Sequence, residues 1–266
     1  MNRSLQSNLR NDLVTIVTVS YNQGPYLKRC IDSVLEQNYT NLQYIVVDAG
    51  SRDGSQAIIE TYGEKIESII EPDKGPADGL NKGFNQARGK FLAFINADDY
   101  FLPGALIHVV EYFNTHHDCE LLTCSGLIET EFSNKMRKIN PEKLTIHGLL
   151  YNFQVMFQQG TFFRTELFKR VGGFNPNNKT CWDLELFLRM VVNGAKQGIS
   201  NQEIAVFFVH NGSLTGSGRL NKQYYSDRKR LFDEYLKREW SKRDDFFELA
   251  YRALSKLKRL CEKILS

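Results

Sequence analysis

The chain has 266 residues, of which 42% are hydrophobic and 24% charged, and its formal net charge at neutral pH is +3. This composition is ordinary for a soluble globular protein with one large domain or two small ones. No apolar run is long enough for a membrane span, the polar start Met1–Ser4 lacks the apolar core of a signal peptide, and the five cysteines lie scattered without metal-type spacing. We therefore expect a cytoplasmic protein with reduced thiols.

Apolar runs and amphipathic stretches alternate through the first part of the chain. Apolar, β-branched runs predict buried strands, and apolar residues spaced by three and four predict helices. The predicted strands are Leu13–Ser20, Leu42–Asp48, Ile66–Glu71 and Lys90–Ile95. The predicted helices contain Leu27–Leu35, Ser55–Tyr62, Pro76–Ala87 and Pro103–Thr115. Strands separated by helices in this way predict βαβ units, and hence an α/β fold with a mostly parallel sheet flanked by helices.

The pattern becomes irregular after Leu121. Strands are predicted at Leu121–Glu129, Lys135–Asn140 and Glu203–Val209. Helices are predicted at Thr165–Val171 and Asp183–Val192. Between them lies a stretch rich in glutamine and aromatic residues, Gly148–Phe163. There is neither an internal repeat nor a low-complexity linker, so we expect residues 1–218 to form one domain and residues 219–266 to form a helical tail.

The fourth predicted strand ends in the acidic sequence Asn96-Ala97-Asp98-Asp99. Ligands of open α/β sheets bind just beyond the carboxyl ends of the strands. Adjacent carboxylates repel each other unless a cation or hydrogen bonds compensate, and hard oxygen ligands suit Mg²⁺ or Mn²⁺. The sequence therefore predicts either a divalent cation site at Asp98 and Asp99 or a pair of acids that caps the following helix.

A series of motifs then resembles one enzyme family. The motifs are Val17–Asn22, Val46–Ser55, Glu71–Gly83, Asn96–Asp99, Gly160–Arg164, Val171–Phe174 and Asp183–Arg189. In this order and spacing they resemble the family 2 glycosyltransferases, which have the GT-A fold, a single α/β domain. The resemblance covers about residues 12 to 216. It implies a nucleotide-sugar-binding half at about 12–100 and an acceptor-binding half at about 101–218.

The resemblance implies a donor site made from several loops. Its expected residues are Ser20, Tyr21, Asn22, Asp48, Lys74, Asp78, Asn81, Lys82, Asn96 and Ala97. Tyr21 would stack on the base, and Asp48 would accept hydrogen bonds from base or ribose, unless it only stabilises its own turn. Many relatives carry a second acid where this chain has Ala49, so UDP- and GDP-linked donors both stay open.

The resemblance also implies the residues of the reaction itself. Asp98, Asp99 and His210 would hold Mn²⁺ or Mg²⁺, although a lone histidine is as readily structural. Asp183, six positions before Arg189, would be the catalytic base, with helix capping as the alternative or additional role. Trp182 and Gln159 are expected on the acceptor side, where Trp182 would be either a platform for a sugar ring or part of the core.

The predicted tail carries a charge of opposite sign to the rest of the chain. From Arg219 to Ser266 there are 14 Lys and Arg residues against 8 Asp and Glu, whereas the remainder is mildly acidic. Apolar residues recur at helical spacing in Tyr251–Ser266, so this segment either lies on an anionic membrane surface or packs on protein. A peripheral site at the inner face of the cell membrane would fit the first alternative.

We therefore expect an inverting, metal-dependent glycosyltransferase that acts on a glycan or lipid-linked glycan, with no nucleic acid among its partners. Two other functions stay open at this point. A sugar-phosphate nucleotidyltransferase also uses an α/β sheet and acidic metal ligands, but Ser20–Gln23 is not a glycine-rich, basic phosphate loop. A non-catalytic subunit that binds nucleotide sugars is disfavoured by the intact Asp98 and Asp183.

Overall fold

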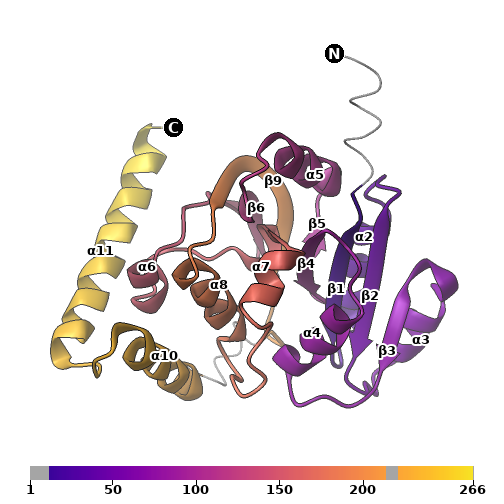
Figure 1. The fold of residues 1–266 in the computed structure, drawn as a ribbon, viewed down its shortest axis with the longest axis horizontal. Coiled ribbons are helices and arrows are strands. Elements are labelled where there is room, and N and C mark those ends of the chain that lie inside the picture. Colours follow the sequence, from indigo (N-terminus) through magenta and orange to yellow (C-terminus); the bar gives the residue numbers. More distant parts are fainter. Residues whose placement is uncertain (1–11, 214–220, 266) are drawn as a thin grey trace.

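A sheet curls through the middle of the protein, and helices cover it (Figure 1). The computed structural model describes residues 12–213 and 221–265. Within these residues the strand order is β3-β2-β1-β4-β8-β6-β9-β5, and β7 pairs with β6. The fold is therefore α/β, as the alternation of strand and helix patterns predicts.

The first part of the sheet is parallel and follows the predicted strands closely. It consists of β1 (Val14–Ser20), β2 (Leu42–Asp48), β3 (Glu67–Ile70) and β4 (Phe91–Asn96). β1 pairs in parallel with both β2 and β4, and β2 pairs in parallel with β3. The carboxyl ends of β1, β2 and β4 therefore meet at one edge, because Val19 is opposite both Val47 and Asn96 in the register.

Antiparallel pairing enters in the second part of the sheet. Its strands are β5 (Tyr100–Phe101), β6 (Leu121–Thr130), β7 (Ser133–Ile139), β8 (Thr161–Arg164) and β9 (Gln197–Val209). β8 is antiparallel to β4 and β6, while β6 and β9 run in parallel. β9 begins earlier than the predicted start at Glu203, because its polar first half continues along β6 past irregularities near Ser125.

The helices between the strands lie close to their predicted places, except for α6, which was not predicted. They are α2 (Gly24–Leu35), α3 (Ser55–Glu60), α4 (Pro76–Asn85), α5 (Ala105–Thr115), α6 (Ile146–Leu150), α7 (Thr165–Arg170) and α8 (Trp182–Val192), with 3₁₀ turns η1 (Gly63–Lys65) and η2 (Gln158–Gly160). α5 begins two residues after the predicted Pro103, because Gly104 has a positive φ of 81° and turns the chain into the helix.

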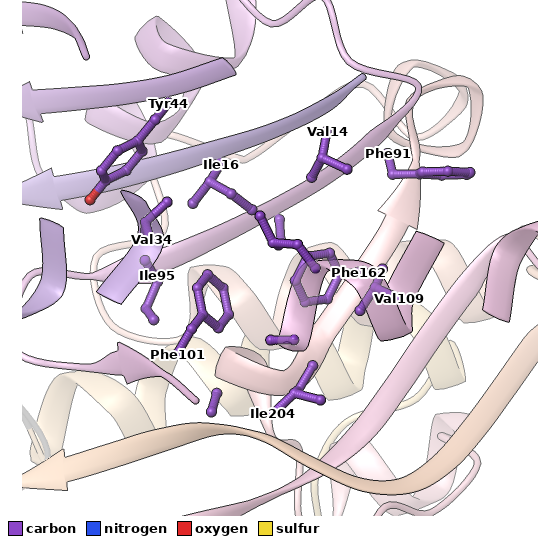
Figure 2. Packing of buried hydrophobic residues seen from close by; sticks show 14 of the residues in the cluster. Val14, Ile16, Val34, Tyr44, Phe91, Ile95, Phe101, Val109, Phe162 and Ile204 are labelled. Atoms are coloured by element: carbon purple, nitrogen blue, oxygen red, sulfur yellow. The ribbon is translucent and has the colours of Figure 1, made fainter. Parts of the chain in front are cut away.

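Two apolar clusters pack on the two faces of the sheet. Alternation along β1 sends Val14 and Ile16 to the cluster beneath α2 and α5, and Val17 to the cluster beneath α4, α7 and α8. Figure 2 shows the first cluster, in which Phe101, Phe162 and Ile204 from the segments after β4 pack with residues of β1 and α2 such as Ile16 and Val34. The predicted donor and acceptor halves therefore share this cluster.

Two helices follow the sheet, α10 (Asn221–Leu236) and α11 (Lys242–Leu265), on the side away from β3 and α3 (Figure 1). α10 is part of the body, since Leu231 and Phe232 are fully buried in the second cluster. The first turns of α11 contact the body, where Tyr251 stacks on Phe153. No helix in the described part of the chain is long and apolar enough to cross a membrane.

Candidate active site

The two adjacent acids after β4 lie in different environments. Asp99 is 0% exposed, and its carboxylate accepts hydrogen bonds from Gln159 Nε2 (2.8 Å), Phe208 N (2.9 Å) and Asn96 Nδ2 (3.3 Å). Burial and the neighbouring Asp98 carboxylate raise the pKa of Asp99 well above its usual range. Asp99 thus ties the end of β4 to η2 and β9, and its oxygens are already occupied.

Asp98 instead pairs with the histidine at the end of β9. Its Oδ2 lies 3.1 Å from His210 Nε2, and Gly212 N donates to His210 Nδ1 at 3.2 Å. Since Nδ1 accepts this bond, Nε2 carries the proton and donates to Asp98. Burial raises the pKa of Asp98, and the His210 hydrogen bond opposes that shift. The sequence placed these two residues 112 positions apart, and the fold brings them together.

Asp98 and His210 are residue types that can ligate a cation bound to phosphate. A carboxylate oxygen and an imidazole nitrogen are both metal ligands, and Mg²⁺ sites commonly use one or two protein ligands with substrate phosphates and water. Within residues 12–213 and 221–265, no group of three or more His, Cys, Asp and Glu side chains is arranged to hold a metal. The Asp98 carboxylate therefore fits a cation that binds together with a nucleotide, and His210 Nε2 can join it as a ligand once the ring proton moves to Nδ1 and the bond from Gly212 N breaks. Neither acid caps α5, whose N-cap is Gly104.

The loops after β1 and β2 are joined to each other. Asn22 N donates to Ser51 Oγ (2.8 Å), and Arg52 N donates to Asn22 Oδ1 (2.9 Å). Asp48 is buried and accepts from Ser51 N (2.7 Å) and Ser51 Oγ (2.6 Å), so its carboxylate stabilises this turn. Tyr21, between these loops, is 61% exposed and its ring is free to stack on a ligand. Ser20 Oγ is buried and has no partner within the described residues.

The predicted residues of α4 and the turn before it serve different contacts. Asp78 Oδ2 accepts from Lys74 N (3.0 Å), whereas Lys82 Nζ reaches Pro72 O (2.7 Å) and Glu71 Oε1 (2.8 Å). Asn81 forms two hydrogen bonds of 2.9 Å with the backbone of Phe174. Asn81 therefore connects the donor half to the loop that precedes α8.

The glutamines of η2 lie against the end of β4. Gln158 Nε2 donates to Phe94 O at 2.6 Å, and Asn96 Nδ2 donates to Gln158 Oε1 at 3.4 Å. Gln159 is buried and holds Asp99, so in this structure it supports the acidic turn. Ala97 is buried in the core beneath α2 and α5, where its side chain packs among apolar residues.

Asp183 lies in the first turn of α8 and is partly buried. Its Oδ1 accepts from Leu184 N at 2.8 Å, and the N-cap of the helix is Cys181 rather than Asp183. Burial raises the pKa of Asp183 to about 6, which suits a carboxylate that takes a proton near neutral pH. The adjacent Trp182 is buried, with its ring 5.5 Å from that of Phe94 on β4, so it brings the start of α8 to the end of β4.

The loop before α8, residues 174–181, is here named the base loop. Its contacts were not predicted from the sequence. Glu185 accepts from Asn175 Nδ2 (2.8 Å) and Asn178 Nδ2 (2.7 Å), and Lys179 Nζ donates to Lys74 O (2.7 Å) in the donor half. The run of asparagines in this segment was the available signal, because buried amides need partners.

The comparison with protein families decides between the enzyme classes. Residues 15–172 match the model of "Glycosyl transferase family 2". The chain belongs to this family. The match includes Tyr21, Asp48, Asp98 and Asp99 but ends before the base loop, so the roles of Asp183 and His210 depend on the geometry described above.

Family 2 relatives and solved structures agree with this assignment. A "putative teichuronic acid biosynthesis glycosyltransferase", TuaG of Bacillus subtilis, is 27% identical over 216 residues, which are 77% of this chain and 82% of that protein. TarS of S. aureus, residues 1–349 in complex with UDP-GlcNAc, superimposes with a TM-score of 0.71 and 18% identity, over 92% of this chain and 73% of that one.

Another solved neighbour is a complex with a metal ion. The mannosyltransferase PcManGT from Pyrobaculum calidifontis, in complex with GDP-Man and Mn²⁺, has a TM-score of 0.65 and 17% identity, over 92% of this chain and 70% of that one. These neighbours show that the fold is that of GT-A proteins. The chain spans 61% and 60% of the length of relatives from Rickettsia typhi and Rickettsia prowazekii.

Proposed function

We propose that this family 2 protein is an inverting, metal-dependent glycosyltransferase that moves a sugar from a nucleotide-sugar donor to a hydroxyl of a glycan or lipid-linked glycan. The observation that carries the proposal is the Asp98–His210 pair, which brings two side chains of metal-ligating types together at the carboxyl end of β4. PcManGT with GDP-Man and Mn²⁺ supports the metal, and TarS with UDP-GlcNAc supports a nucleotide-sugar donor. Family membership speaks against a nucleotidyltransferase.

The donor would lie across the ends of β1, β2 and β4. Tyr21 is the exposed aromatic ring at this edge and would stack on the base, whether uracil or guanine. The linked loops at Asn22 and Ser51 hold the backbone around it. A divalent cation at Asp98 and His210 would neutralise charge on the diphosphate that leaves.

Asp183 would act as the general base. The acceptor oxygen attacks the anomeric carbon from the side opposite the diphosphate, the bond from that carbon to the phosphate oxygen breaks, and the acceptor proton passes to the Asp183 carboxylate. One such displacement inverts the anomeric centre. Leu184 N donates a hydrogen bond to one oxygen of the Asp183 carboxylate, and this bond fixes the orientation of the second oxygen.

Thermal stabilisation by a panel of nucleotide sugars, each with and without Mn²⁺, tests the donor part of this proposal. A ligand that binds the native state raises the melting temperature by mass action. We expect one UDP- or GDP-linked sugar to stabilise the protein in Mn²⁺ and to be hydrolysed slowly without acceptor. Stabilisation without hydrolysis or transfer by any donor would favour a non-catalytic binding subunit.

We propose further that α11 attaches the protein to an anionic membrane surface, at the inner face of the cell membrane. Glu248 pairs with Arg228 on the body at 3.1 Å, and Tyr251 stacks on Phe153. Phe246 and Leu249, which lie elsewhere on the helix, are each 68% exposed. From Leu249 to Ser266 there are five Lys and Arg residues against one Glu, so apolar and basic groups occur together.

Co-sedimentation with vesicles that contain anionic lipid tests this attachment. Leu249→Ser should reduce the bound fraction, and high salt should reduce binding of the wild type, because exposed charges are screened within about 8 Å at physiological ionic strength. Deletion of residues 252–266 leaves the Tyr251–Phe153 contact and should release the protein. If the deleted chain sediments like the full chain, the membrane proposal is wrong. A change of oligomeric state would mean that α11 packs on a second copy.

A further inference from the structure

α10 is connected to the base loop and to the first turn of α8 by partly buried polar contacts. Arg230 Nη2 lies 2.7 Å from Glu185 Oε2, and Thr180 Oγ1 donates to Asp227 Oδ2 at 2.6 Å. Asp227 in turn accepts from Gln223 Nε2 at 2.9 Å on its own helix. Two points of α10 therefore hold the segment on either side of Asp183.

Glu185 is the centre of these contacts. It is 4% exposed and accepts from Asn175, Asn178 and Arg230. Burial acts to raise the pKa of Glu185, but these hydrogen bonds and the Arg230 charge hold the pKa below its ordinary value. Glu185 is therefore a carboxylate in the folded protein, and its two oxygens connect the beginning of the base loop to α10.

Hydrogen bonds within the base loop also hold it in place. Asn178 is buried, and its Oδ1 accepts from Cys181 N at 3.0 Å and Thr180 N at 3.2 Å. The loop leads directly into the first turn of α8, where Asp183 stands two residues before Glu185. A shift of α10 would move Glu185, and Asp183 would move with it because both belong to one helical turn.

We propose that α10 sets the position of the catalytic base, with Glu185 and Arg230 as positioning residues. The proposal rests on the assignment of Asp183 as base. Neither residue needs to touch the substrate. Displacement of a reacting group by about 1 Å can lower the rate about 100-fold, so a loosened base loop should lower turnover without affecting a donor site built on β1, β2 and β4.

Arg230 allows the positioning role to be tested with a matched control, because the same side chain makes one contact to Glu185 and another to Glu234. Its Nη2 bonds the buried Glu185, while its Nη1 bonds the exposed Glu234 at 3.2 Å. We expect Arg230→Ala to lower kcat between about 10- and 100-fold. Arg230→Lys, which keeps the charge, should recover most of this loss. Glu234→Gln, which removes only the exposed contact, should behave as wild type.

The binding of the nucleotide sugar separates positioning from general destabilisation. For Arg230→Ala we expect the stoichiometry and Kd of the donor, from titration calorimetry, to stay within about twofold of wild type while kcat falls. An equal loss of binding stoichiometry and kcat would show a partly unfolded protein and would overturn the positioning role. Asp227→Asn, which weakens the second contact point, should give the same pattern to a smaller extent.

Asp183→Asn in the same assay distinguishes failure of this inference from failure of the proposed function. If Asp183→Asn is inactive and Arg230→Ala turns over like wild type, α10 does not position the base and the proposed function stands. If Asp183→Asn itself turns over like wild type, Asp183 is not the base, and both proposals are overturned.

Discussion

The two sides of the candidate active site are built in different ways. On the donor side, Tyr21, Asn22, Asp48 and Asp98 lie at strand ends or within two residues of them, and neighbouring loops hold them through bonds such as Asn22 to Ser51. On the base side, Asp183 depends on the base loop and on a helix that follows it by many residues. Under our proposals, donor binding is a property of the sheet edge, whereas turnover also depends on the contacts of α10 with the base loop and Glu185.

Asp98→Ala is the change that we expect to have the largest effect. It removes the carboxylate that pairs with His210 at 3.1 Å, and with it the site for a cation on the diphosphate. Transfer that depends on Mn²⁺ or Mg²⁺ should be abolished, while the fold stays intact because Asp99 makes the structural contacts of this turn. Transfer assays with and without a chelator measure this. Full activity of the variant in chelator would contradict the metal assignment.

Asp183→Asn should lower turnover about 10²–10⁴-fold, the usual range for loss of a general base, with donor affinity nearly unchanged. The amide still accepts from Leu184 N but takes no proton at neutral pH. Steady-state kinetics with saturating donor give the comparison. An effect on donor affinity as large as that on turnover would place Asp183 in the donor site instead.

The pH dependence sharpens the same prediction. Because the pKa of Asp183 is raised to about 6, wild-type turnover should rise with pH through about 6 as the carboxylate forms. The native state holds this proton more tightly than the unfolded chain, whose Asp pKa is about 3.9, so burial of Asp183 lowers the free energy of unfolding as pH rises between these values. Asp183→Asn should lack this loss and be no less stable than wild type at pH 7, as chemical denaturation can show.

Tyr21→Ala should have the smallest effect of the three and act on binding alone. Stacking of a base on an aromatic ring contributes about 1–3 kcal/mol, which corresponds to roughly 5- to 150-fold in donor affinity. Tyr21→Phe keeps the ring and is the matched control. Since the side chain is 61% exposed, stability should not change. Equal donor affinity for Tyr21→Ala and wild type would remove Tyr21 from the donor site.

The sequence predicts the donor half better than the rest, for a physical reason. Its parallel strands are buried on both faces, so they appear as continuous apolar runs between amphipathic helices, and β1, β2 and β4 lie within a residue or two of their predicted bounds. Motifs at the ends of these strands then lie together by topology alone. The family resemblance implied that Asp98 and His210 serve one metal site, but it did not predict their hydrogen bond, and nothing local in the sequence indicates it.

The other parts depend on partners that are distant in sequence. The polar start of β9 does not look like a strand, and β5 and β8 are too short to give a pattern. α10 has a charged sequence that favours a solvated tail, yet two of its apolar residues complete the second cluster. The predicted stripe at residues 257–265 involves side chains outside the described residues, so its role stays a prediction.

The burial of Leu231 and Phe232 has a consequence for how the protein is made. Chains leave the ribosome with the N-terminal part first, so the sheet edge that we propose as the donor site can form while α10 has not yet been synthesised. Until then, the apolar surface beneath α10 faces water and is a site for aggregation. The base loop gains its last contacts only when residues 227 and 230 arrive. During biosynthesis, the chain should therefore be able to bind the nucleotide sugar before it is able to transfer the sugar.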